Sequence, residues 1–343
     1  RLIIMDEPTT ALTNKEIEML FVLMRRLKEQ GVTMIYISHK MPELFSICDR
    51  YTVLRDGMFI ESGYFKDINE RKATELLVGR CIENEKIEKE KISEEILMEV
   101  KNITSEGKFK DISFNLRKGE VIAVTGLHGD GRDQLAEALY GVCKIDSGEV
   151  WINGKKLGYR SIKDTVENGI SMVQRNRKER SIIKDMSILN NFSVSRFVSK
   201  HKKLFIDDKS EIERFDARKK EMSTKIGHYD DYITSLSGGN QQKVVFAKLL
   251  NSDVNILLLD EPTKGVDVGA KAQIYSIMSD LAAQGYAIIL VSSEMPEVMS
   301  MADRIGVLHE GHLAAIFDAS HVTQEEILAA AMTVKDEDLK EGA

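Results

Sequence analysis

The sequence predicts an α/β fold with a mainly parallel core sheet, and three observations support this class. Short apolar segments at residues 2–5, 32–38 and 121–125 have the length and composition of buried strands. Helical patterns separate such segments, and the order strand, helix, strand with short apolar strands is typical of a buried parallel sheet. The third observation is an internal repeat, which shows that one strand and helix series occurs twice.

The repeat begins at the tetrapeptide Asp-Glu-Pro-Thr, which occupies residues 6–9 and 260–263, 254 positions apart (260 − 6). An apolar strand precedes each tetrapeptide. The register continues without a gap through Met-Pro-Glu, at 41–43 and 295–297, to a glycine at 57 and 311. Chance does not keep such a register, so it indicates a duplication. Because the first copy begins in mid-domain at residue 1, we expect one and a half copies, the first truncated at its N-terminus.

Three segments follow from this pattern. Residues 1–80 form the C-terminal part of the first copy, and its first helix carries Ile17, Leu20, Met24 and Leu27 on one face. Residues 81–95 are a charged linker with isolated isoleucines and no periodic apolar face. Residues 96–343 form a complete second copy, with antiparallel-type strands around residues 112–116 and a mostly helical insert near residues 185–227.

Composition excludes several classes of partner. The 343 residues carry 48 basic and 55 acidic side chains, a net charge of −7, which argues against a broad nucleic-acid interface because phosphate binding needs clustered Lys and Arg. No apolar run approaches the ~18 residues needed to cross a bilayer, so a role at a membrane requires a partner. The three cysteines lack metal-site spacing and receive no function.

Three glycines, Gly126, Gly129 and Gly131, lie between a predicted strand and a helical pattern. Their spacing fits GxxxxGK[ST], in which backbone N–H groups surround phosphates, Lys contacts them and the hydroxyl binds Mg²⁺. Arg132 keeps the positive charge here, whereas Asp133 replaces the hydroxyl with a carboxylate. At ~4 Å and an effective dielectric of ~20, that carboxylate repels one phosphate charge by about 4 kcal/mol unless Mg²⁺ lies between them. The sequence predicts a degenerate phosphate loop, and a structural Gly-rich turn stays an alternative.

The string LSGGNQQK contains Ser237, Gly238, Gly239 and Asn240 and precedes a helical pattern. A Ser hydroxyl and two Gly amides at a helix N-terminus form a second phosphate-binding edge. A simple helix N-cap would explain the serine but not the whole string.

This string, followed by an apolar strand that ends in Asp260 and Glu261, resembles the signature and Walker B elements of ATP-binding cassette (ABC) ATPases. The forms SGGNQQKV and GxGR, together with Val-Gly-Arg at residues 78–80, resemble the tandem-cassette ATPases of bacterial simple-sugar importers of the ribose, galactose and xylose class. The resemblance covers essentially the whole chain. It implies a P-loop NTPase-type cassette with a mainly parallel core sheet, an antiparallel β subdomain and a helical subdomain.

The resemblance also implies that the two cassettes pair head to tail and hold ATP and Mg²⁺ between them. In the first site, Asp6 holds Mg²⁺ through water, Glu7 is the catalytic carboxylate and His39 contacts the γ-phosphate as the switch residue. The signature residues 237–240 clamp this nucleotide from the other cassette. A capped core histidine at position 39 and a helix N-terminal charge at position 7 are the structural alternatives.

The second site uses the loop from Gly126 to Asp133, with Asp260 holding Mg²⁺ through water and Glu261 orienting or deprotonating the attacking water. Ser293 stands where the repeat places the switch histidine. Gln174 is either the loop glutamine that touches the metal or an exposed residue at a strand end. Because the partner elements of both sites would lie upstream of residue 1, we expect this chain alone to hydrolyse ATP weakly or not at all.

By this resemblance, the chain energises sugar uptake through transmembrane permease subunits at the cytoplasmic face of the membrane. An extracellular or periplasmic sugar-binding protein is an indirect partner. The alternatives are a soluble tandem cassette that acts on ribosomes or DNA, and a catalytically weak regulatory or truncated cassette. The short linker of mixed charge and the acidic balance fit neither the ribosomal nor the DNA type.

Overall fold

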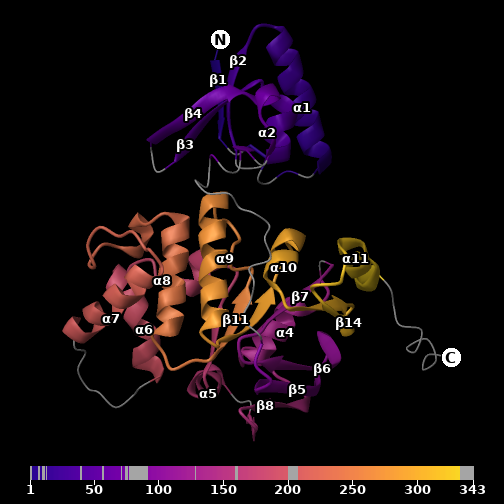
Figure 1. The fold of residues 1–343 in the computed structure, drawn as a ribbon, viewed down its shortest axis with the longest axis vertical. Helices are drawn as coiled ribbons and strands as arrows, with labels where there is room; N and C mark the ends of the chain where they lie inside the picture. The colour runs from indigo at the N-terminus through magenta and orange to yellow at the C-terminus, as the bar shows by residue number, and fades with distance from the viewer. Residues whose placement is uncertain are drawn as a thin grey trace, which may run out of the picture. The chain divides into compact units, whose positions relative to one another are not determined.

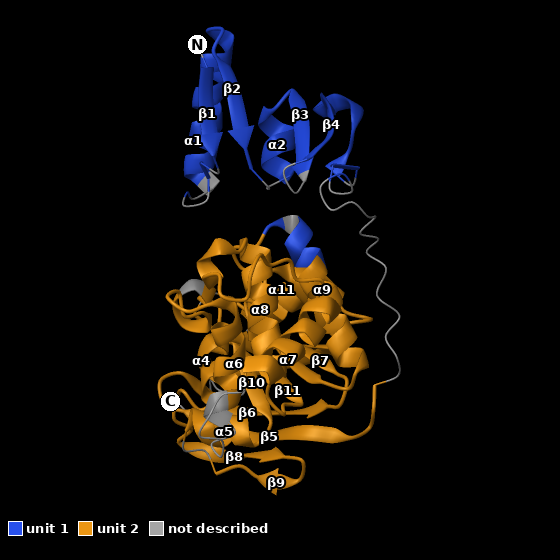
Figure 2. Cartoon of the chain, turned by 90° about the vertical axis from the view of Figure 1, so that its left-hand side faces the viewer, with its two compact units in different colours: residues 1–85, 267–272 blue, residues 86–266, 273–343 orange. Residues whose placement is uncertain are grey.

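The computed structural model describes most of the chain: residues 2–6, 8–9, 12, 14–38, 41–55, 58–70, 72–73, 76, 92–127, 129–158, 161–199 and 208–332. Figure 1 shows the fold, and Figure 2 colours its two compact units. Unit 1 comprises residues 1–85 with 267–272, and unit 2 comprises residues 86–266 with 273–343. Most of the predicted linker at 81–95 lies outside the described residues.

The elements of unit 1 whose bounds are described form two small sheets and include the helices α1 and α2. Its elements are β1 (Leu2–Asp6), α1 (Asn14–Glu29), β2 (Thr33–Ile37), α2 (Met41–Ile47), β3 (Arg50–Arg55), β4 (Met58–Tyr64) and the 3-10 helix η1 (Phe65–Asp67). β1 and β2 pair in parallel, whereas β3 and β4 form an antiparallel hairpin. The predicted face of α1 is the covered one, since Phe21 and Met24 are buried and Leu27 is partly buried.

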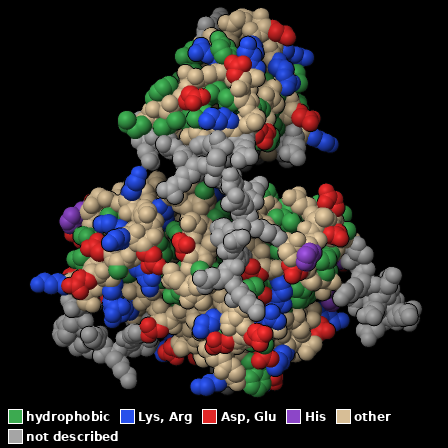
Figure 3. All heavy atoms as spheres, viewed as in Figure 1, with side chains coloured by type: hydrophobic (Ala, Val, Ile, Leu, Met, Phe, Trp, Pro, Cys, Tyr) green, Lys and Arg blue, Asp and Glu red, His purple; other side chains and the backbone are tan. Residues whose placement is uncertain are grey.

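The parallel strands of unit 1 are far more exposed than their repeats in unit 2. Leu2 and Ile4 of β1 are 58% and 63% exposed, whereas every residue of the equivalent strand β11 (Ile256–Asp260) is buried. Burial alternates along β1, so Leu2 and Ile4 share a face that no described residue covers, whereas β11 is buried on both faces. Hydrophobic side chains are accordingly visible on the surface of unit 1 in Figure 3.

Unit 2 is built on a six-stranded sheet in the order β10-β11-β12-β7-β13-β14. Besides β11, its strands are β7 (Val121–Gly126), β10 (Ile170–Val173), β12 (Ala287–Val291), β13 (Arg304–His309) and β14 (His312–Asp318). All neighbouring pairs are parallel except β13 with β14, which is antiparallel. The central strands are apolar and buried along their whole length because helices cover both faces. Their carboxyl ends therefore meet at one edge, where the predicted motifs follow.

A second, antiparallel sheet has the order β6-β5-β8-β9, and its strands are β5 (Ile96–Ser105), β6 (Phe109–Arg117), β8 (Ser147–Ile152) and β9 (Lys155–Lys156). The helices of unit 2 are α4 (Arg132–Leu139), α5 (Ile162–Glu167), α6 (Ile188–Ser199), α7 (Asp208–Glu221), α8 (Gly238–Leu250), α10 (Met295–Met301), α11 (Gln324–Met332) and, from residue 273 on, α9 (Val268–Ala283). Short helices η2 (Arg177–Ser181) and η3 (Ile233–Ser235) join them. None of the described helices is both long enough and apolar enough to traverse a bilayer.

The predicted helical insert is a packed subdomain of α6, α7 and α8. Phe192, Phe215 and Phe246 contribute one fully buried ring from each helix, and the first two rings lie 5.0 Å apart. Together, the parallel sheet, the antiparallel sheet and this helical subdomain confirm the predicted fold class.

Candidate functional site

The predicted phosphate loop joins β7 to α4 at the carboxyl edge of the parallel sheet. Gly129 and Gly131 have φ values of 86° and 94°, in the left-handed region that favours glycine. A Cβ at position 131 would lie 2.7 Å from the Lys108 carbonyl oxygen, so this position also requires a residue without a side chain. Gly131 is the N-cap of α4 and has no side chain with which to cap the helix. The first N–H groups of α4 therefore point into the loop without a cap from this residue.

The interior of the loop is filled by two of its own side chains, Arg132 and Asp130. Nη1 of Arg132 donates to the Gly126 carbonyl oxygen at 2.6 Å and to Oδ2 of Asp130 at 3.0 Å. The Arg132 backbone N–H donates to Oδ1 of the same aspartate at 3.0 Å. Both side chains are buried, and a Cβ at position 126 would lie 2.0 Å from the Asp130 carboxylate. Arg132 therefore neutralises an aspartate of its own loop, a partner that the sequence reasoning did not consider.

Asp133 lies in the first turn of α4 and pairs with Arg175, which lies just beyond β10. The same arginine donates its backbone N–H to Asp260 at the end of β11. Arg175 thus connects the carboxylate that replaces the loop hydroxyl to the carboxylate of the Walker B strand. The predicted Gln174 precedes this arginine and is half-buried, and its carbonyl oxygen accepts a hydrogen bond from Ser181 at 3.2 Å.

Asp260 is 5% exposed, and burial raises its pKa to about 6, helped by the negative charges of Asp133 and Glu261 and opposed by Arg175. Oδ1 of Asp260 and Oδ1 of Asp133 are buried and have no hydrogen-bond partner among the described residues. Two such oxygens suit a hard divalent cation. No group of three or more acidic, His or Cys ligands gathers in the described part of the chain, so Mg²⁺ would complete its shell with water and phosphate oxygens.

Glu261 follows Asp260 in a sharp turn, with a φ of 48° that is unusual for a residue with a side chain. Its backbone N–H donates to the Val291 carbonyl oxygen at 2.8 Å, and its Oε1 accepts the Ser293 backbone N–H at 2.9 Å. The candidate catalytic carboxylate is therefore held against the segment that carries Ser293 at the switch position.

Of the first-copy residues, Asp6 ends β1, whereas Glu7 and His39 lie outside the described residues.

The signature string forms the N-terminus of α8. Ser237 is the N-cap, and its Oγ accepts the backbone N–H of Asn240 at 3.4 Å and its side-chain amide at 3.2 Å. Oδ1 of Asn240 accepts the Lys225 backbone N–H at 3.1 Å, which joins the signature turn to the preceding segment. Gly238 and Gly239 supply the first backbone N–H groups of the helix. The capping alternative and the phosphate-edge prediction are compatible, because Ser237 caps the helix and remains exposed.

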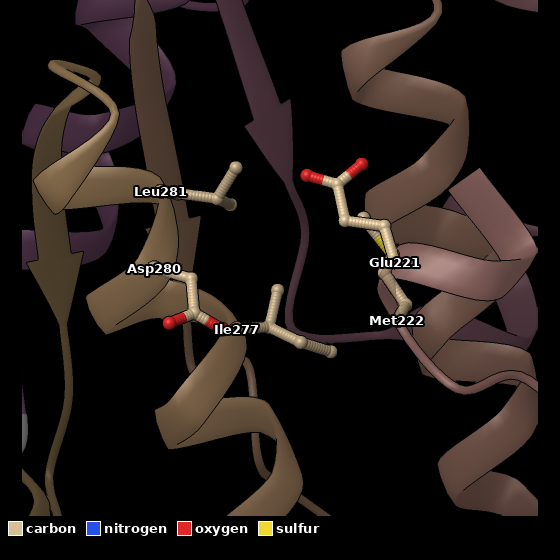
Figure 4. Close-up of a pocket in the computed structure, with 5 residues that line it drawn as sticks. All are labelled: Glu221, Met222, Ile277, Asp280 and Leu281. Carbon is tan, nitrogen blue, oxygen red and sulfur yellow. The ribbon is translucent and has the colours of Figure 1, made fainter. Parts of the chain in front are cut away.

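A small pocket lies apart from these motifs, between the end of α7 and the helix α9 (Figure 4). It is lined by Glu221, Met222, Ile277, Asp280 and Leu281. None of the predicted site residues contributes to it, so it does not affect the assignment of the nucleotide site.

These features define the class of P-loop nucleotide-binding cassettes. They are a parallel sheet with a Gly-rich phosphate loop, an acidic pair on the adjacent strand and a signature helix. Residues 109–264 match the ABC transporter family. The chain is 42% identical over 331 residues to the ribose import ATP-binding protein RbsA of Bacillus licheniformis, covering 96% of this chain and 67% of the relative. It is 43% identical over 330 residues to the protein of that name from Geobacillus kaustophilus, with the same coverage.

Solved structures show the same fold. A nucleotide-free ATP-binding cassette from an ABC transporter superposes with a TM-score of 0.57 at 22% identity, covering 68% of this chain and 93% of that one. The protein cbiO1 of Clostridium perfringens, part of an ABC transporter complex, gives a TM-score of 0.58 at 23% identity with the same coverage. The chain belongs to the family of ABC transporter ATP-binding proteins, which confirms the family resemblance of the sequence.

Proposed function

We propose that this chain is an ATP-binding and ATP-hydrolysing subunit that energises the uptake of a simple sugar through a membrane permease. The observation that carries the proposal is the joint presence of the signature helix and the buried acidic pair, Asp260 and Glu261, in a chain closely similar to ribose import proteins. The subunit would act at the cytoplasmic face of the membrane, with transmembrane permease subunits as direct partners and a sugar-binding protein as an indirect one.

ATP supplies the phosphoryl group, and Mg²⁺ neutralises the charge that develops on it during transfer. Asp260 would hold the metal through water, as would Asp6 in the first copy. Glu261 would orient a water molecule: the Ser293 backbone N–H holds its Oε1, and its other oxygen would accept a proton. The N-terminus of α8 would present its N–H groups to the phosphates of the nucleotide on the paired cassette.

A second candidate, a catalytically weak second site, is favoured by a specific observation. Arg132 is already paired with Asp130 inside the phosphate loop, and Ser293 has no imidazole with which to contact a γ-phosphate. In this arrangement the second copy contributes its signature edge to the first site, where Asp6, Glu7 and His39 would carry out hydrolysis. This division of labour is compatible with the transport proposal.

Transport is tested by uptake of radiolabelled ribose, galactose and xylose in cells that lack their own ATP-binding subunit. The protein is expressed in its complete form together with its permease. We expect ATP-dependent uptake of at least one sugar and copurification with the permease in detergent. Cosedimentation with ribosomes, without any association with membranes, would instead support a soluble tandem ATPase. The matched variant Glu7→Gln should abolish uptake and leave assembly with the permease intact.

A further inference from the structure

A buried glutamate of α10, Glu297, lies behind the candidate catalytic segment. Its side chain is fully buried, and each carboxylate oxygen accepts one hydroxyl: Oε1 from Thr263 at 3.0 Å and Oε2 from Ser292 at 2.5 Å. Both hydroxyl groups are buried as well. Burying a carboxylate is unfavourable unless it is hydrogen-bonded. The two hydroxyl groups therefore offset part of the desolvation penalty of Glu297.

The two hydroxyl partners flank the hydrogen bond made by the catalytic carboxylate. Thr263 comes two residues after Glu261, and Ser292 comes immediately before Ser293, whose backbone N–H donates to Glu261. Ser292 also accepts the backbone N–H of Glu294 through its Oγ at 3.1 Å, which fixes the turn into α10. One carboxylate therefore holds the two chain segments that the Glu261–Ser293 hydrogen bond joins. Because Glu261 has a strained φ of 48°, its orientation depends on such surrounding contacts.

The first copy contains the same hydrogen bond between threonine and glutamate. Oε2 of Glu43 accepts it from Oγ1 of Thr9 at 2.8 Å and also accepts the hydroxyl of Tyr36, on β2, at 2.8 Å. Thr9 and Glu43 are separated by 34 residues, as are Thr263 and Glu297. The Tyr36 hydroxyl has no counterpart in the second copy, where Leu290 occupies the equivalent position. The bond between the threonine of the tetrapeptide and the buried glutamate is therefore retained although its surroundings differ.

We propose that Glu297 and Glu43 are positioning residues, which set the geometry of the catalytic glutamate in each copy by tying the Asp-Glu-Pro-Thr turn to the switch segment. The proposal rests on the proposed function, because it concerns the same reaction. If Glu297 only satisfied buried hydroxyl groups, its substitution would change stability alone. If it is a positioning residue, its substitution also changes the protection of the Ser293 amide from hydrogen exchange and the rate of the chemical step.

The first experiment measures residue-resolved hydrogen exchange in the folded chain. Glu297→Leu should speed exchange of the Ser293 amide by roughly tenfold relative to wild type, since its acceptor Glu261 is no longer held in place. Glu297→Gln keeps the shape and can still bond both hydroxyl groups, so it should restore most of the protection. The matched control is Glu211→Leu, which removes another buried carboxylate, one paired with Arg196 and Asn251 in the helical subdomain.

The control should lower the melting temperature without changing exchange at Ser293. The proposal is overturned if Glu297→Leu leaves the Ser293 amide protected, or if the control speeds its exchange equally.

The second experiment measures ATPase kinetics of the complete protein assembled with its permease. Glu43→Leu should lower kcat by roughly tenfold and change KM for ATP by less than about twofold, because the transition state is affected more than substrate binding. In a Glu7→Gln background the same substitution should have no further effect on kcat, since Glu43 acts through Glu7. An additive loss in that background would contradict the positioning role. A wild-type assembly without any ATPase activity would refute the proposed function, and the exchange experiment then decides the positioning of Glu261 by itself.

Discussion

Replacing Asp130 with alanine should make the second phosphate loop bind nucleotide more tightly. In the folded chain the Asp130 and Arg132 side chains are 3% and 8% exposed and lie 3.0 Å apart, so the positive charge of the loop is neutralised before any phosphate arrives. A bound phosphate would also meet the aspartate itself. At ~4 Å and an effective dielectric of ~20, repulsion from one phosphate charge is about 4 kcal/mol.

Screening by Arg132 and Mg²⁺ removes part of that repulsion. A net gain of about 1.5–3 kcal/mol remains, which corresponds to roughly 10- to 100-fold tighter binding. The assay is equilibrium titration of the purified chain with a fluorescent ATP analogue in Mg²⁺. Asp130→Asn should give an intermediate affinity, and a thermal melt verifies that each variant is folded.

Asp146→Ala is the matched control, because it removes an equal charge from an exposed site just before β8 that pairs with Lys144. It should leave nucleotide affinity unchanged. Unchanged or weaker binding by a folded Asp130→Ala variant would refute the reasoning, since it would mean that the aspartate supports the loop rather than competing with phosphate.

Three further predictions concern the acidic groups. Because burial raises the pKa of Asp260 to about 6, protons should compete with Mg²⁺ for this carboxylate as pH falls through 6. In calorimetric titrations, Mg²⁺-dependent nucleotide binding should be weaker at pH 5.5 than at pH 7.5. Asp260→Asn should remove this difference between the two pH values. Burial raises the pKa of Glu297 from 4.5 to about 7, so its contribution to stability is fully present below about 4.5 and lost as pH rises through 7. Urea unfolding at pH 5.5 and 8 should show this loss in the wild type and a smaller one in Glu297→Gln. The purified chain should turn over ATP slowly, because Arg132 is paired within its loop and Ser293 lacks an imidazole; fast Mg²⁺-dependent turnover that Glu261→Gln abolishes would contradict this expectation.

Elements with a strong local pattern could be predicted from the sequence. The core strand expected at residues 121–125 is β7 at Val121–Gly126. The helix expected after the string LSGGNQQK begins within that string, at Gly238, because Ser237 caps it. Apolar periodicity locates the body of an element, whereas capping determines where it begins.

Contacts between distant segments were harder to predict. Arg175 is 42 residues from Asp133, and nothing local distinguishes it from the neighbouring Gln174. Asp130 lies only two residues from Arg132, yet the motif suggested that the arginine would face a phosphate. A motif specifies which residue types occupy a loop, but the rotamers they adopt depend on the charges around them. The glutamate that ties the tetrapeptide to the switch segment was detectable in principle, because the repeat contains its threonine and glutamate twice at one spacing.

The two parts of the second cassette differ in how well they suit nucleotide binding. Its phosphate loop encloses its own ion pair, and its switch position carries Ser293. Its signature helix, by contrast, begins at an exposed N-cap, Ser237, which is followed by the partly exposed Gly238. Under the proposed head-to-tail pairing, the signature serves the nucleotide of the other cassette, whereas the loop serves its own. We therefore expect substitutions in the signature to impair transport more than equivalent substitutions in the phosphate loop of the second cassette.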